Sequence, residues 1–271
     1  MNEPRKLKRG LRDISPLFES QTSGKPLPVS IPERGIECFG IFSPDSAGDS
    51  LFLTTYLASR LAQPDHPCSI ISLTSPHDRQ ARDPHSLLKI ESFGAHLKRF
   101  SLSSEQFDEV CKRPVPPYSA APSSPLLFLD FEYANVLYFE KAMPVIDKWI
   151  ILIQPAFESL SEAYKMMKAA AALNNRLEYF LLYDGPASDS RGGLVFERFS
   201  EMVSRRLRIN LGWLGSLHLP KGVESFSAEL ALDNLFLRPS EGSDSVEKRS
   251  LAALVRALPA SGAGAAALQG G

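Results

Sequence analysis

A series of short apolar runs, separated by amphipathic stretches, constrains the fold of this 271-residue chain more than any other feature. The clearest run, LLFLDF at 126–131, is apolar at almost every position. Strands that are buried on both faces of a parallel sheet have this pattern. Further β-prone runs of strand length are found at 36–42, 68–75, 148–155, 178–184 and 211–220.

Helical patterns alternate with these runs. Helices are predicted at 49–62, 103–113, 135–147, 158–174, 192–207 and 245–258. The less regular stretch 83–102 is predicted to form a helix and then a short strand. Such alternation is typical of α/β proteins, and right-handed crossovers put helices on both faces of a parallel sheet. The sequence therefore predicts a doubly wound, mostly parallel sheet in a three-layer α/β/α sandwich.

One domain of this kind accounts for 36–258, and both ends of the chain differ from it in composition. Residues 1–35 include a Ser-, Pro- and Gly-rich stretch of the kind found in flexible linkers. Residues 259–271 are of low complexity, and we expect them to be disordered.

A short amphipathic segment at 5–18 precedes the linker. Its apolar residues recur at near-helical spacing, lysines and arginines fill its other faces, and Pro16 would end a helix just before it. The apolar residues, which we predict to bind a partner, are Leu7, Leu11, Ile14 and Phe18. The segment is interpreted either as a docking peptide for a protein groove or a membrane surface, or as a helix that packs on its own domain.

Composition and charge exclude several classes of function. A net charge of −1 gives no general attraction to nucleic acid, and the basic run at 205–210 is interpreted as complementing a helix dipole. The three cysteines lie far apart, as in reduced cytosolic proteins. No apolar run approaches the roughly 20 residues that cross a bilayer, and none follows the basic N-terminus as in a secretory signal. We expect a cytoplasmic protein without specific nucleic-acid binding.

The common catalytic and metal-binding motifs are missing from the sequence. The five histidines have no second ligand at i+3 or i+4 on a predicted helix, and no C-x-x-C or G-x-S-x-G occurs. No catalytic residue and no metal ligand is therefore predicted. The remaining candidate site is the carboxyl edge of the sheet, where ligands bind in doubly wound folds. The predicted strands place the loop at 43–50, Asp130, Pro155 and Asp184 along this edge.

Three stretches within 35–258 resemble, in their order, the MinD/ParA superfamily of deviant-Walker P-loop ATPases, and its MinD and FlhG branch in particular. IFSPDSAGDSLFLTTYLASRLA stands in place of the P-loop and first helix, and LLFLDFEYAN in place of the Walker B strand. KWIILIQPAFESLSEAYKMMKAAAALN, then EYFLLYD and LGWLGSLHLP, is similar to the second half of the family fold. The resemblance implies a P-loop NTPase-like fold, dimers that form across ATP, and a nucleotide site at Gly48, Ser50, Asp130 and Asp184.

The phosphate-binding loop departs from the family pattern G-K-G-G-x-G-K-[ST]. Gly48 and the Ser50 hydroxyl are retained, whereas other positions of the pattern hold Ser43, Pro44, Asp45, Ser46 and Asp49. Asp49 replaces the lysine that meets the phosphates, and Pro44 replaces the family lysine and removes a backbone donor. Two like charges about 4 Å apart repel by roughly 4 kcal/mol at an effective dielectric of 20. At Asp184 the family has an asparagine that contacts the base. We interpret the site as vestigial.

These departures predict a degenerate Walker A motif and a pseudo-ATPase. We expect a non-catalytic MinD/FlhG-like adaptor or regulatory protein that positions or regulates a bacterial cytoplasmic or polar machinery through protein–protein contacts. No cofactor is expected, because Asp49 and Pro44 disfavour ATP and magnesium. The alternative is a divergent ATPase that still binds and slowly hydrolyses ATP, in which Lys141 or Lys148 replaces the lost lysine. Homodimers and peripheral membrane contact are compatible with both hypotheses, and a dimer of the pseudo-ATPase would be constitutive.

Overall fold

The structure is a computed structural model. It describes residues 36–43, 47–73, 89–93, 96–112, 126–131, 140–186, 189, 191–218, 226–237 and 245–257. The amphipathic segment at 5–18, the linker that follows it and the tail at 259–271 lie outside the described residues. No helix in the described ranges is long and apolar enough to cross a membrane.

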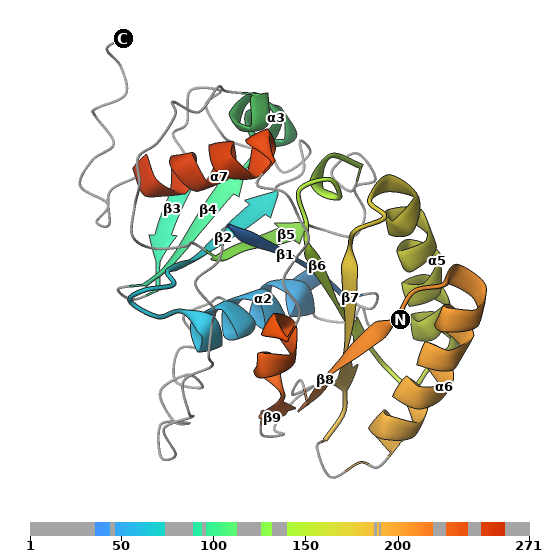
Figure 1. Ribbon diagram of the computed structural model, residues 1–271. Helices are drawn as coiled ribbons and strands as arrows, with labels where there is room; N and C mark the ends of the chain where they lie inside the picture. Colours follow the sequence, from blue (N-terminus) through green and yellow to red (C-terminus); the bar gives the residue numbers. More distant parts are fainter. Residues whose placement is uncertain are drawn as a thin grey trace, which may run out of the picture.

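The described strands form one nine-stranded sheet in the order β3-β4-β2-β5-β1-β6-β7-β8-β9 (Figure 1). From β4 to β8 neighbouring strands are parallel, whereas β3 and β9 pair antiparallel at the two edges. The bounds are β1 (Glu37–Phe42), β2 (Cys68–Leu73), β3 (Lys89–Ser92), β4 (Leu97–Leu102), β5 (Leu126–Phe131), β6 (Lys148–Ile153), β7 (Glu178–Asp184), β8 (Leu211–His218) and β9 (Ser227–Leu230). The predicted mostly parallel sheet is confirmed.

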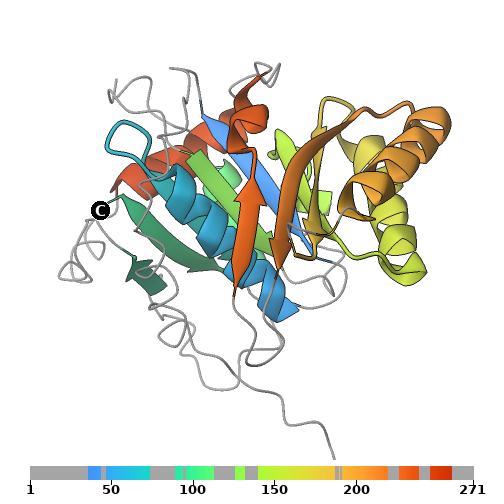
Figure 2. The same ribbon diagram turned by 90° about the horizontal axis from the view of Figure 1, so that it is seen from below.

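Helices cover both faces of the sheet (Figures 1 and 2). The helix α2 (Ala47–Leu61) and the 3₁₀ helix η2 (Leu232–Phe236) share one core with the sheet, to which they contribute Leu57 and Leu235. The other core receives side chains from α3 (Ser104–Lys112), α5 (Phe157–Leu173), α6 (Arg191–Leu207) and α7 (Val246–Ala257). Two apolar cores on opposite faces of one sheet make the predicted three-layer sandwich.

The central strands are apolar because both of their faces are buried. All six residues of β1, β2 and β6 are buried, the charged ones among them included. On the α2 face, the rings of Phe39 in β1 and Phe128 in β5 stack with centroids 4.9 Å apart. On the other face, Trp149 of β6 packs near Phe42 and Tyr179. Parallel strands of this kind are readily predicted from sequence, because double burial removes polar residues.

Side-chain contacts define the start of α3 and the core face of α5. At α3 the Ser103 hydroxyl accepts a hydrogen bond from the Gln106 backbone N–H, and the Gln106 side chain accepts one from the Ser103 N–H. The core face of α5 is formed by its buried residues Ser159, Ala163, Met167 and Ala170, while the larger Leu160 and Tyr164 are only partly buried.

Other elements differ from the predictions. The antiparallel strands β3 and β9 and the helix η2 were not predicted, since the edge strands are only four residues long and carry charged residues. Of the helix predicted at 135–147, the structure describes only 140–147, where helix is confined to 140–142 and a turn follows. That part of the prediction is wrong. The chain turns at 143–145, and the Asp147 carboxylate accepts a hydrogen bond from the backbone N–H of Cys38 in β1.

Candidate functional site

Asp130 and Ser50 meet at the carboxyl end of the central strands. Asp130 is the fifth residue of β5 and lies in register with Ile41 of β1 on one side and Ser72 of β2 on the other. Ser50 lies in the first turn of α2, which follows β1. The Ser50 hydroxyl donates a hydrogen bond to Asp130 Oδ1 at 2.8 Å. This contact brings together two of the residues that were predicted for the nucleotide site.

A second hydroxyl and an arginine extend this contact into a network. The Ser72 hydroxyl donates to Asp130 Oδ2 at 3.4 Å, and Arg99 Nε of β4 donates to the Ser72 oxygen at 2.9 Å. The guanidinium of Arg99 also pairs with Glu91 of β3 at 3.3 Å. Both carboxylate oxygens of Asp130 therefore accept hydrogen bonds from the protein, and a cation stands one hydroxyl away. We refer to Ser50, Asp130, Ser72 and Arg99 as the Asp130 network.

Burial dominates the protonation of Asp130. Removal from water raises the pKa of this carboxyl above its ordinary value, while the bonds from Ser50 and Ser72 and the charge of Arg99 lower it in part. The folded state therefore binds this proton more tightly than the unfolded chain, whose aspartates titrate near pH 3.9. The contribution of Asp130 to stability consequently decreases as pH rises from that value through the raised folded pKa.

Asp184 does not join the Asp130 network. It ends β7, and β1 and β6 lie between β5 and β7 in the sheet. At about 4.8 Å per strand, this separates the two carboxylates by roughly 14 Å. Asp184 instead accepts a bond from the Gln154 side-chain amide, just after β6, at 2.8 Å. The four residues predicted for one nucleotide site are thus divided between two places on the same edge.

The loop residues are described only in part. Gly48 and Asp49 belong to the first turn of α2, two residues and one residue before Ser50. Pro44, Asp45 and Ser46 lie outside the described residues, so the predictions made on their side chains remain predictions. Asp49 is nonetheless an acidic residue in the helix turn that also holds Ser50.

Neither lysine proposed to replace the one lost at Asp49 is placed to do so. Lys148 is the first residue of β6, at the amino end of the sheet, where its fully buried ammonium binds Glu37 Oε1 at 3.0 Å. Lys141 forms an ion pair with Asp108 of α3. Both assignments are wrong, because each ammonium is neutralised by a carboxylate on another element.

Two members of the Asp130 network, Ser72 and Arg99, were not predicted from the sequence. Ser72 is one of two serines in the buried strand β2, and this was the only local signal for it. Arg99 gave no local signal, because its role depends on the strand order that places β4 beside β2 and β2 beside β5. The pattern of elements along the chain does not specify that order.

The Asp130 network contains oxygen ligands for a magnesium ion but no unpaired cation for the phosphates of a nucleotide. A magnesium ion would need Ser50 and Asp130 oxygens as direct or water-bridged ligands, and these oxygens keep lone pairs beside the hydrogen bonds that they form in this structure. The cation nearest to Asp130 in these contacts, Arg99, is bound to Ser72 and Glu91. Asp49 adds a negative charge in the first turn of α2. We therefore derive no catalytic step through a nucleotide.

Comparison with solved structures finds proteins of the family that the sequence motifs resemble. The MinD–MinC cell division complex of Aquifex aeolicus is 14% identical over 82% of this chain and 97% of that chain, with a TM-score of 0.44. A plasmid partition protein of Borrelia burgdorferi is 11% identical over 83% of this chain and 100% of that chain, at 0.45. A ParA family ATPase of Chlorobium tepidum is 14% identical over 68% of this chain and 85% of that chain, at 0.41. No protein-family model and no curated protein sequence matches the chain.

Proposed function

We propose that the chain is a non-catalytic, MinD/ParA-like adaptor or regulatory protein, which positions or regulates a bacterial cytoplasmic or polar machinery through protein–protein contacts. The observation that carries this proposal is the Asp130 network. A carboxylate in the place of the Walker B acid is bound by hydroxyls on both of its oxygens. In this account α2 is held to the sheet by the protein's own side chains, so that the platform is formed without nucleotide.

Charge supports the same proposal. The first turn of α2 is where a helix dipole and backbone N–H groups favour a bound anion, but here Asp49 occupies that turn. A negative charge at this position in the sequence disfavours a polyphosphate, and the lysines that the alternative hypothesis required are bound elsewhere. A divergent ATPase would need a cation that none of the described contacts supplies.

Measurement of phosphate release tests the catalytic half of the proposal. The full chain should release phosphate from Mg-ATP no faster than buffer does, and Asp130→Asn should behave identically. A rate above buffer that Asp130→Asn abolishes would establish the divergent ATPase instead. Asp130→Asn is a suitable variant because its amide keeps an oxygen to accept the Ser50 bond.

Partner binding is the other half of the proposal, and it is assigned to the amphipathic segment with Leu7, Leu11, Ile14 and Phe18. Among the similar structures, one is a MinC–MinD complex and another is ParA bound to nonspecific DNA. For this chain we propose protein contacts, with homodimers and peripheral membrane association as further modes in a cytoplasmic or polar location. Co-sedimentation with anionic liposomes separates these modes. Loss of sedimentation when Leu11 and Phe18 are changed to serine would favour a membrane surface over a protein groove.

A further inference from the structure

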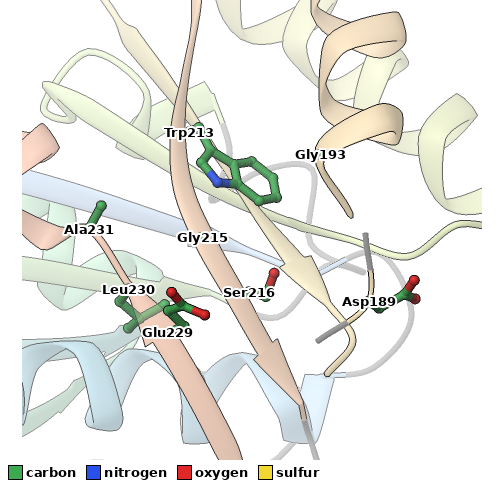
Figure 3. A pocket seen from close by; sticks show the side chains of 8 residues that line it. All are labelled: Asp189, Gly193, Trp213, Gly215, Ser216, Glu229, Leu230 and Ala231. Carbon is green, nitrogen blue, oxygen red and sulfur yellow. The ribbon is translucent and has the colours of Figure 1, made fainter. Parts of the chain in front are cut away.

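A cavity of about 440 Å³ lies at the β8–β9 edge of the sheet, beside the beginning of α6 (Figure 3). Its lining includes Trp213 and Ser216 of β8, Glu229 of β9, Gly193 of α6, and Asp189 just before that helix. In the sheet order, β8 lies four strand positions from β5, which carries Asp130. The cavity is therefore separate from the candidate nucleotide site.

A β-bulge in β8 places two side chains of this lining on one face. Trp213 pairs with Leu181 and Ser216 pairs with Tyr183, with the irregularity between them. Trp213 and Ser216 therefore point the same way although they are three residues apart. The bulge requires glycine at 215, where φ is +113° and a Cβ would lie 2.0 Å from the Glu229 carbonyl oxygen.

Glu229 of β9 is a further lining residue of the cavity. It lies directly opposite Ser216 in the antiparallel β8–β9 pair, which puts the two Cβ atoms about 4.5–5.5 Å apart on the same face. Glu229 is exposed and forms no ion pair with the described residues. The Asp189 carboxylate, by contrast, is already bound by Arg191 and by the Tyr183 hydroxyl.

Ser216 is the residue that indicates a ligand. It is 9% exposed and lines the cavity, and among the described residues its hydroxyl has no hydrogen-bond partner. Because this hydroxyl lines the cavity, it is open to a hydrogen-bonding group that enters there. A donor group in the cavity would meet this hydroxyl oxygen, the Glu229 carboxylate and the face or edge of the Trp213 ring.

We propose that this cavity binds the guanidinium group of an arginine side chain from a separate polypeptide. The described lining side chains include the Glu229 carboxylate, one hydroxyl and an indole, and none of them is basic; the second carboxylate, that of Asp189, is already bound by Arg191. A planar cation with several N–H donors can bind a carboxylate in bidentate fashion and stack on an aromatic ring, which an ammonium group does less well. This assignment goes beyond the proposed function and does not rest on it, since the β8–β9 edge takes no part in the Asp130 network.

Titration of the full chain with N-acetyl-arginine amide, followed by NMR, tests the assignment. A single side chain should bind with a dissociation constant on the order of 1 mM. The isosteric, uncharged N-acetyl-citrulline amide should bind at least about tenfold more weakly, because it cannot form the charge-assisted bonds. Glu229→Gln should weaken arginine binding about tenfold and Ser216→Ala a few-fold, whereas Glu201→Gln on the exposed side of α6 should leave it unchanged.

The outcomes separate the possible occupants. Equal binding of the two ligands, no binding of either, or unchanged binding by Glu229→Gln would overturn the site. A full-length variant with Lys6, Lys8, Arg9 and Arg12 changed to glutamine controls for the chain's own basic segment. If that variant binds the arginine probe much more tightly than the natural chain, the guanidinium site stands but its occupant is the chain's own segment, which overturns the assignment to a separate polypeptide.

Discussion

The amino and carboxyl ends of the parallel sheet both bury carboxylates, but they neutralise them in different ways. At the amino end, Asp147 pairs directly with Lys248 of α7, and Glu37 pairs with Lys148. At the carboxyl end, the Asp130 carboxylate accepts hydrogen bonds from two serine hydroxyls. The cation of this network, Arg99, binds Ser72 and not Asp130 itself. Ion pairs between segments that are distant in sequence thus hold the amino end together. The carboxyl end has no such direct pair at Asp130, and burial raises the pKa of this carboxyl.

The amino end should be the more fragile of the two. Lys248→Met removes the ion pair of the buried Asp147 and leaves its bond with the Cys38 N–H, so that a nearly uncompensated charge remains. We expect a loss of about 3–5 kcal/mol in the free energy of unfolding, measured by urea denaturation. Lys165→Met, which breaks an exposed ion pair on α5, should cost less than about 1 kcal/mol. Equal losses in the two variants would contradict the proposed closure of the amino end.

A change at Arg99 should have an intermediate effect. Arg99→Met removes the donor to Ser72 and the ion pair with Glu91, and we expect a loss of about 1–3 kcal/mol. Because the Arg99 charge lowers the pKa of Asp130, the variant should also raise that pKa further. An NMR titration of the Asp130 carboxyl carbon measures the shift, with the exposed Arg198→Met as the control. No movement of the Asp130 titration would show that Arg99 is electrostatically remote.

Asp130→Asn should have the smallest effect on stability and a distinct pH dependence. The natural protein loses stability as pH rises from about 3.9 through the raised folded pKa of Asp130, and an amide has no such dependence. The variant should therefore gain relative to the natural protein over this pH range and stay within about 1 kcal/mol of it at neutral pH. Urea unfolding at a series of pH values checks this. A relative loss with rising pH would mean that Asp130 is a stabilising anion like Asp147.

The success of the sequence predictions varied with how far apart the interacting residues lie. The central strands were predicted because burial on both faces leaves a continuous apolar run, as in β5 and β6. Asp130 and Ser50 were predicted through the resemblance to a P-loop family, which assigns the one to the end of a strand and the other to the start of a helix. Arg99 and the Glu37–Lys148 pair escaped prediction, since both depend on which strands are neighbours and not on local pattern.

The edge strands were missed for a different reason. β9 (SAEL) is short and only half-buried, so its pattern is that of a loop. The cavity beside it depends on the bulge at Gly215, where the close approach of the Glu229 carbonyl selects glycine. From the sequence alone, LGWLGSLH indicated a strand but not where its register shifts.

The most direct test of the account is a calorimetric titration of the full chain with Mg-ATP. The Asp130 network and Asp49 predict no saturable binding with a dissociation constant below about 100 µM, which corresponds to roughly 5.5 kcal/mol of binding free energy. Gly48→Trp, which would obstruct a phosphate at the start of α2, serves as the reference for nonspecific heat. Binding tighter than about 100 µM that Gly48→Trp abolishes would contradict the account and identify the carboxyl edge as a working nucleotide site.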